Sequence, residues 1–212
     1  VYMQPEIDAR LGIAMGVSLA EVRRAAAAHP GARAALFVYP TYYGVANELP
    51  EIADFLHTRG ILVLVDGAHG AQFALSDGLP PSAMQAGADL SAESTHKMLG
   101  SLTQTSMLLA RGGRVPAERI RAASGLLQST SPNELLLASL DAARLQMEEE
   151  GRVRLDAAIC CAEELRARIN ALPGLWAFGG AYMGAPGRVA LDPLKVTVNV
   201  AGLGLSGFAA EE

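Results

Sequence analysis

Lysine is scarce in this chain, and one of its two lysines lies among residues suited to amine chemistry. The 17 basic residues comprise 15 arginines together with Lys97 and Lys195. Imine formation with a carbonyl needs a primary amine, which a guanidinium group does not supply. Lys97 ends the sequence Ser94-Thr95-His96-Lys97, 31 residues after Asp66. This setting indicates that Lys97 forms a Schiff base, whereas Lys195 has no polar neighbours of interest and is expected at the surface.

Capping residues and hydrophobic periodicity predict alternating helices and strands in the first half of the chain. The order implies right-handed crossovers and a mostly parallel sheet. The predicted elements are a helix from the Ser18–Glu21 capping box to about His29, a strand at 34–38, a helix at 49–59, a strand at 61–65, a short helix at 81–86 and a strand at 89–93.

The second half of the sequence predicts a strand at 102–110, a helix at 116–127 and a long helical region at 131–171, with Gly151 as its likeliest break or kink. After Pro173-Gly174 the sequence becomes glycine-rich and includes an alternating strand at 195–200. We therefore expect two parts. Residues 1–171 would be a partial cofactor-binding large domain, and residues 172–212 the start of a smaller α+β domain.

Polar residues follow three of the predicted strands, where the core does not require them. They form the segments Tyr39–Gly44, Asp66–Gly70 and Ser94–Lys97. Ligands in open parallel sheets bind beyond the carboxyl ends of the strands. An acid, two histidines, hydroxyls and a lysine should therefore gather at one rim of the sheet.

Pyridoxal phosphate (PLP) gives each of these residues a role. The cofactor acts as an electron sink when its pyridine nitrogen is protonated, and Asp66 would hold that proton. Ala68 is small enough for a flat ring to lie against the backbone, and His69 would contact the phenolic oxygen. The alternatives remain open: Asp66 as a turn or cap residue, Ala68 as a small loop residue, and His69 as a satisfied loop histidine.

The remaining candidates concern the amine and the phosphate. The Lys97 amine must lose its proton to form an imine, so we expect it to be buried beside the cofactor. Ser94 and His96 would donate hydrogen bonds to the phosphate, although hydroxyl-rich turns also cap helices. Ser129 and Thr130 are either a further phosphate-facing group or part of the cap of the long helix.

Composition argues against several other classes of protein. A formal net charge of −5 without basic runs excludes a nucleic-acid-binding surface. No apolar stretch reaches the roughly 20 residues that span a bilayer. Cys160 and Cys161 are adjacent, a spacing that suits neither a zinc site nor a usual disulfide, so we expect buried thiols in a cytoplasmic protein without a metal.

At this point the sequence resembles the Orn/Lys/Arg decarboxylases, which are PLP enzymes of fold type I acting on basic amino acids. The resemblance covers nearly the whole chain. It rests on the segments Pro40–Gly44, Val65–Ala71, Ser94–Lys97, Leu102–Ser106, Gln128–Pro132, Asp192-Pro193 and Gly204–Gly207.

The resemblance implies a three-layer fold type I large domain and a decarboxylase of arginine, lysine or ornithine that produces amines of polyamine pathways. Lys97 would be the Schiff-base lysine, Asp66 the pyridinium partner and His69 the ligand of the phenolic oxygen. The region of Ser129 and Thr130 would reach the cofactor of a neighbouring subunit, which implies a homodimer or higher homo-oligomer.

Two positions depart from the family pattern, and segments of the family are missing. Gly67 stands where an acidic residue is usual, and Gln72 where a second histidine is common. The phosphate-binding turn and the ring-stacking residue of the family would lie upstream of Val1. We therefore expect the chain to be a fragment of a longer enzyme.

The mechanism implied is exchange of the Lys97 imine for the substrate amine, loss of CO2 into the electron sink, and return of a proton by Lys97 or a histidine. Two alternatives stay open. One is another fold type I reaction, such as that of an aminotransferase, an oxoamine synthase or a lyase. The other is a non-catalytic relative, which the departures at Gly67 and Gln72 make plausible.

Overall fold

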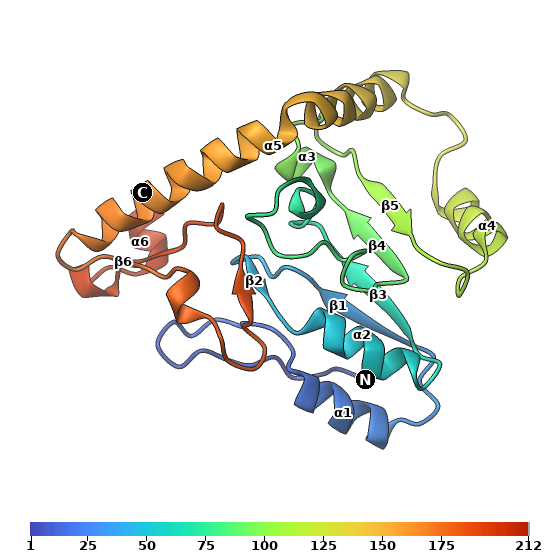
Figure 1. Ribbon diagram of the computed structural model, residues 1–212, viewed down its shortest axis with the longest axis horizontal. Coiled ribbons are helices and arrows are strands. Elements are labelled where there is room, and N and C mark those ends of the chain that lie inside the picture. The colour runs from blue at the N-terminus through green and yellow to red at the C-terminus, as the bar shows by residue number, and fades with distance from the viewer. Residues whose placement is uncertain (212) are drawn as a thin grey trace.

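A four-stranded sheet forms the centre of the molecule, in the order β1 (Ala34–Val38), β3 (Leu62–Asp66), β4 (Leu90–Glu93) and β5 (Met107–Ala110). The computed structural model describes residues 1–211 (Figure 1). Strands β1, β3 and β4 are parallel, and β5 runs antiparallel to β4. The mostly parallel sheet expected from the sequence is therefore confirmed.

Helices α1 (Leu19–Ala28) and α2 (Leu49–His57) cover one face of this sheet (Figure 1). Alternate strand residues such as Phe37 and Val63 are buried and belong to the same hydrophobic cluster as Ile52 of α2. The predicted capping box begins α1, where Ser18 Oγ accepts a hydrogen bond from the Glu21 N–H at 3.4 Å. Burial of one helix face against one sheet face thus builds the main core.

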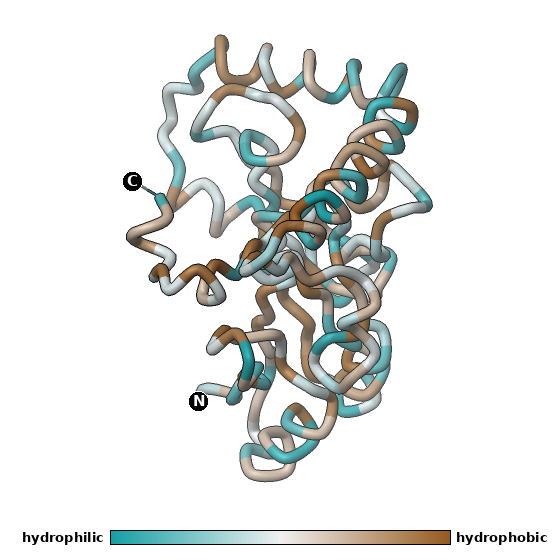
Figure 2. Tube along the Cα trace, turned by 90° about the vertical axis from the view of Figure 1, so that its left-hand side faces the viewer, coloured by the Kyte–Doolittle hydropathy of each residue, from teal (hydrophilic) through white to brown (hydrophobic). Residues whose placement is uncertain are grey.

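The opposite face of the sheet is apolar and open. Leu36 and Val38 of β1 are 65% and 56% exposed, and Leu108 of β5 is 51% exposed. The register places Val38 opposite Asp66, and Asp66 opposite Ala92, so the Asp66 side chain shares this open face. Hydrophobic stretches of chain run through the middle of the molecule in Figure 2.

The chain returns to the region of the first strands near its end. Strand β2 (Val45–Ala46) pairs antiparallel with β7 (Ala190–Leu191), and β6 (Trp176–Ala177) pairs with β8 (Val198–Asn199). The division of the chain after residue 171 stays a prediction. The other helices are α3 (Thr95–Met98), α4 (Ala117–Leu127), α5 (Glu134–Asn170) and α6 (Gly207–Glu211), with 3-10 turns at Phe73–Leu75, Gly180–Tyr182 and Ala201–Leu203.

Two predicted helical features are wrong. Residues 81–86 form turns instead of a helix, with an N–H of Ala88 donating to Ala83 O at 2.9 Å, because Gly87 at φ +98° ends the helical path. A break at Gly151 is absent, since α5 continues through it with helix-forming charged residues on both sides, while a kink there stays a prediction.

Two predicted strands are shorter than expected. The strand at 102–110 is confined to Met107–Ala110, because Gln104 adopts φ 79° in a turn. The strand at 195–200 is confined to Val198–Asn199.

Cys160 and Cys161 were expected to be buried, but they are free and exposed, because α5 buries few of its residues. In Figure 2, hydrophilic and hydrophobic residues alternate along α5. None of the helices within residues 1–211 is long and apolar enough to cross a membrane.

The buried carboxylate of Asp89, directly before β4, connects three parts of the chain. Asp89, which is 1% exposed, accepts a hydrogen bond from the Val63 N–H at 2.8 Å. The same oxygen lies 2.9 Å from His57 Nε2 at the end of α2. The other oxygen accepts from Arg114 Nη1 at 3.2 Å. Asp89 therefore fixes the start of β3, the end of α2 and the segment between β5 and α4.

Replacement of this carboxylate should destabilise the fold. We expect Asp89→Ala to lower the free energy of unfolding by about 3 kcal/mol, because a buried backbone N–H, the His57 ring and the Arg114 guanidinium lose their common partner. Urea denaturation of the intact protein measures this change. The matched control is Asp54→Ala on the exposed side of α2, which should change stability by less than about 0.5 kcal/mol. Equal effects of the two substitutions would contradict the role given to Asp89.

Candidate active site

Asp66 ends β3 and begins the loop that carries the first predicted site residues. Its carboxylate is exposed at the carboxyl edge of the sheet, where Oδ1 accepts a hydrogen bond from the Ala68 N–H at 3.1 Å. The side chain of Ala68 is half-buried. This hydrogen bond is of the kind expected if Asp66 were a turn residue, which was one of the alternatives. It occupies only one carboxylate oxygen, so the second oxygen is available to a ligand.

Lys97 lies in the short helix α3, directly after β4, and its side chain is exposed. The expectation that it is buried is therefore wrong for this chain, because no other part of residues 1–211 packs over its side chain. Buried hydroxyls hold the backbone of this helix against the following loop. Ser101 Oγ donates to Thr95 Oγ1 at 2.9 Å, and Thr95 Oγ1 donates to Thr105 O at 3.2 Å. The lysine therefore projects from a well-fixed support at the same sheet edge as Asp66.

His69 is half-buried between Tyr42 and Lys195. Its ring meets the Tyr42 ring edge-to-face, with centroids 5.4 Å apart, and its Nδ1 lies 3.2 Å from Lys195 Nζ. Burial, followed by the positive charges of Lys195 and Lys97, lowers the pKa of His69, while Asp66 acts in the opposite direction. Asp66, His69, Lys97 and Lys195 therefore interact electrostatically. Burial and the two lysine charges together favour a neutral imidazole.

The prediction that Lys195 is a surface residue is wrong. Its side chain is half-buried, and its Nζ reaches His69 and lies 3.8 Å from Met98 Sδ. Burial lowers the pKa of Lys195; Asp192 opposes this shift, and Lys97 adds to it. The scarcity of lysine that singled out Lys97 applied equally to Lys195, so the sequence did contain a signal for this residue.

Gln72, one of the two departures from the family pattern, is fully buried and connects two loops. Its Nε2 donates to His69 O at 3.1 Å and to Asp192 Oδ2 at 2.9 Å. Burial raises the pKa of Asp192, against the hydrogen bonds from Leu194 and Gln72 and the charges of Lys195 and Arg166. Gln72 therefore has a defined structural role in this chain.

Gly67, the other departure, is packed against β4. An added Cβ at this position would lie 2.7 Å from Ser91 Oγ and 3.2 Å from Glu93 Cγ. Ser91 Oγ donates to Glu93 Oε1 at 3.2 Å, and both residues are buried. Burial raises the pKa of Glu93, with the Ser91 bond opposing. The space that a side chain at residue 67 would need is filled by this pair.

The predicted phosphate contacts are only partly brought together. Ser94 and His96 flank Lys97, and His96 Nδ1 lies 2.6 Å from Thr105 O. That carbonyl requires the proton on Nδ1, so the ring donates from Nε2 only when it is positively charged. Ser129 and Thr130 are exposed in the connection between α4 and α5, at the outside of the molecule in Figure 1, where Ser129 Oγ accepts from the Ser131 N–H at 3.1 Å.

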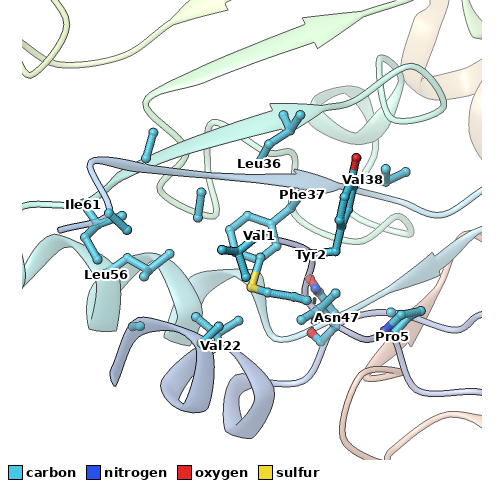
Figure 3. A pocket seen from close by; sticks show the side chains of 18 of the residues that line it. Val1, Tyr2, Pro5, Val22, Leu36, Phe37, Val38, Asn47, Leu56 and Ile61 are labelled. Carbon is cyan, nitrogen blue, oxygen red and sulfur yellow. Dashed lines mark hydrogen bonds between the residues drawn. The ribbon is translucent and has the colours of Figure 1, made fainter. Parts of the chain in front are cut away.

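A large apolar cavity of about 1130 Å³ lies elsewhere, between the N-terminal residues, α1 and the outer edge of β1. Figure 3 shows Val1, Tyr2 and Phe37 pointing into it. Its lining offers no pairing of an amine with a carboxylate. The sheet edge with Asp66 and Lys97 is therefore the candidate active site.

The packing at Gly67 gives a testable expectation. Gly67→Ala should lower the free energy of unfolding by about 2 kcal/mol, because its methyl group overpacks against Ser91. Ser91→Ala should recover part of that loss in the double variant, as a double-mutant cycle in urea would measure. Gly31→Ala, where the added methyl meets nothing within 4 Å, serves as the control. Additive effects of the changes at residues 67 and 91 would overturn this explanation.

Comparison with known sequences identifies the family. The model of the Orn/Lys/Arg decarboxylase major domain matches residues 1–185. The chain is 44% identical over 211 residues to an arginine decarboxylase of Halalkalibacterium halodurans, covering 100% of this chain and 43% of that protein. An arginine decarboxylase of Bacillus subtilis is 42% identical over 212 residues, with the same coverage. The chain thus spans less than half the length of these relatives.

Solved structures agree with the predicted fold. Lysine decarboxylase A from Pseudomonas aeruginosa superposes with a TM-score of 0.75 at 23% identity, over 95% of this chain and 35% of that one. A pyridoxamine-pyruvate aminotransferase from Mesorhizobium loti gives 0.58 at 17% identity, over 76% and 44%. The chain has the α/β fold of the fold type I PLP-dependent enzymes, and by its sequence it belongs to the Orn/Lys/Arg decarboxylase family.

Proposed function

We propose that the whole protein is a PLP-dependent decarboxylase of a basic amino acid, with arginine as the first substrate to test. The observation that carries the proposal is the gathering of Asp66, His69 and Lys97 at the carboxyl edge of the sheet. The choice of arginine is supported by relatives at 41–44% identity that are named arginine decarboxylases.

The residues at this edge fit the cofactor by their chemistry. Asp66 presents an exposed carboxylate that has no salt-bridge partner within residues 1–211, as a protonated pyridine nitrogen requires. Lys97 presents an exposed primary amine on a fixed helix. Ala68, whose N–H binds Asp66, is small. When bound, the cofactor would supply the electron sink for loss of CO2.

The residues of this chain then have distinct roles. Lys97 would hold the cofactor's aldehyde carbon through its amine, and Asp66 would keep a proton on the ring nitrogen. His69 would donate a hydrogen bond to the phenolic oxygen. Ser94, and His96 in its charged form, would contact the phosphate. The proton that replaces CO2 would come from Lys97 or from a histidine.

The open parts of the site require cover from elsewhere in the protein. The apolar sheet face with Leu36, Val38 and Leu108 shares a surface with Asp66, and exclusion of water strengthens electrostatic interactions in an active site. We propose that segments outside this chain cover this face. Ser129 and Thr130 would serve a neighbouring subunit of a homo-oligomer, which fits their exposed position in the connection between α4 and α5. A cytoplasmic location and a role in polyamine synthesis belong to the same proposal.

The two lysines of this chain allow a sharp test of the proposal. Borohydride reduction of the intact protein with bound PLP should leave a covalent adduct on the peptide that contains Lys97, as mass spectrometry would show. Lys97→Arg should lose the adduct and at least about 10³-fold of the rate of CO2 release, because a guanidinium group cannot form the imine.

Product analysis separates this reaction from that of other fold type I enzymes. Arginine should give CO2 and agmatine in equal amounts. Formation of an oxoacid instead would indicate an aminotransferase. An adduct on a residue other than Lys97, or no PLP binding at all, would sink the proposal.

A further inference from the structure

We infer that Lys195 is a positioning residue that fixes the orientation and the tautomer of His69. In this arrangement the Lys195 ammonium donates a hydrogen bond to His69 Nδ1, and the imidazole carries its proton on Nε2. The contact itself is between two residues of this chain. The inference rests on the proposed function only where it assigns the Nε2–H as a hydrogen-bond donor to the bound cofactor.

Neighbouring residues hold the backbone of Lys195 and pack against its side chain. Arg166, which is 8% exposed, donates from Nη2 to Lys195 O at 3.2 Å and to Pro193 O at 3.0 Å. The Lys195 N–H donates to Asp192 O at 3.1 Å. Gly44 lies so close that an added Cβ would be 2.7 Å from Lys195 Cγ. The side chain therefore leaves a fixed turn and passes over a glycine that leaves it room.

The same turn is connected directly to the loop that carries His69. Gln72 Nε2 donates both to His69 O and to Asp192 Oδ2, at 3.1 and 2.9 Å. Gln72 and Asp192 are each 0% exposed. One buried amide thus sets the separation between the backbone of His69 and the turn of Lys195. The contact between the two side chains follows from this connection.

The direction of the hydrogen bond follows from the donor inventory. A charged lysine has three donors and no acceptor, so His69 Nδ1 must accept and Nε2 must carry the proton. Lys195, Lys97 and Asp66 are the charged groups that act on the ring, and Tyr42 and Met98 are the other neighbours of this contact. The two cations oppose protonation of the imidazole. His69 is therefore a neutral hydrogen-bond donor toward a ligand near Asp66 and Lys97, rather than a general base.

The measurement is the pH dependence of deuterium exchange at the histidine C2–H, read for the His69 peptide by mass spectrometry in the intact protein, with and without added PLP. Lys195→Met should shift the His69 midpoint upward, toward the ordinary imidazole value of about 6.5. Lys195→Arg keeps the charge and should keep the midpoint near that of the wild type. Arg168→Met removes an exposed positive charge from α5 and should leave it unchanged.

An unmoved midpoint in Lys195→Met, or an equal shift in Arg168→Met, would overturn the inference. If Lys195→Met does not fold, the wild-type protein still decides the question: ¹⁵N shifts of the His69 ring must report the Nε2–H tautomer, and the Nδ1–H tautomer refutes it. The exchange measurement does not depend on catalysis. A protein that shows the shift but releases no CO2 contradicts the proposed function alone, and one that decarboxylates without the shift contradicts only the role of Lys195.

Discussion

The parallel pairing of β1, β3 and β4 is the constraint on which the rest of the structure depends. It aligns Val38, Asp66 and Ala92 in one row across the sheet. Because all three strands run the same way, their carboxyl ends release their loops at the same edge. A slip of one residue would turn Asp66 into the face packed by α1 and α2, where a charged side chain is costly. The hydrophobic pattern that builds the core therefore also sets the direction of the candidate catalytic carboxylate.

A second, smaller set of buried contacts brings the end of the chain to that edge. Arg166 binds carbonyls of the turn at residues 193–195, and Gln72 binds Asp192. These hydrogen bonds satisfy the buried Gln72 amide N–H and the Arg166 guanidinium with acceptors that include groups far along the sequence. The result is a site in which Lys195 contacts the His69 imidazole and the charge of Lys97 also acts on it. Their charges favour its neutral form.

The departures from the family pattern have local physical explanations. Gly67 leaves space that the Ser91–Glu93 pair fills, and Gln72 supplies an amide that joins two loops. Neither change disturbs the placement of Asp66 or Lys97. The non-catalytic interpretation that these two positions suggested therefore loses its main support.

The sequence by itself determined the elements of the core and the residues that end its strands. Caps, periodicity and the polar segments after residues 38, 65 and 93 are local signals, so the sheet, Asp66 at the end of its strand and the segment that carries Lys97 followed from them, whereas the short helix at Thr95–Met98 did not. Only the tertiary structure decided which distant groups complete the site. Lys195, Asp192 and Gln72 carry little local signal, because their roles arise from contacts across 120 or more residues. The same limit explains the shortened strand at 195–200, where the buried Arg166 binds the Lys195 carbonyl. The error at 81–86 is of another kind, because the turn there depends on the backbone conformation of Gly87.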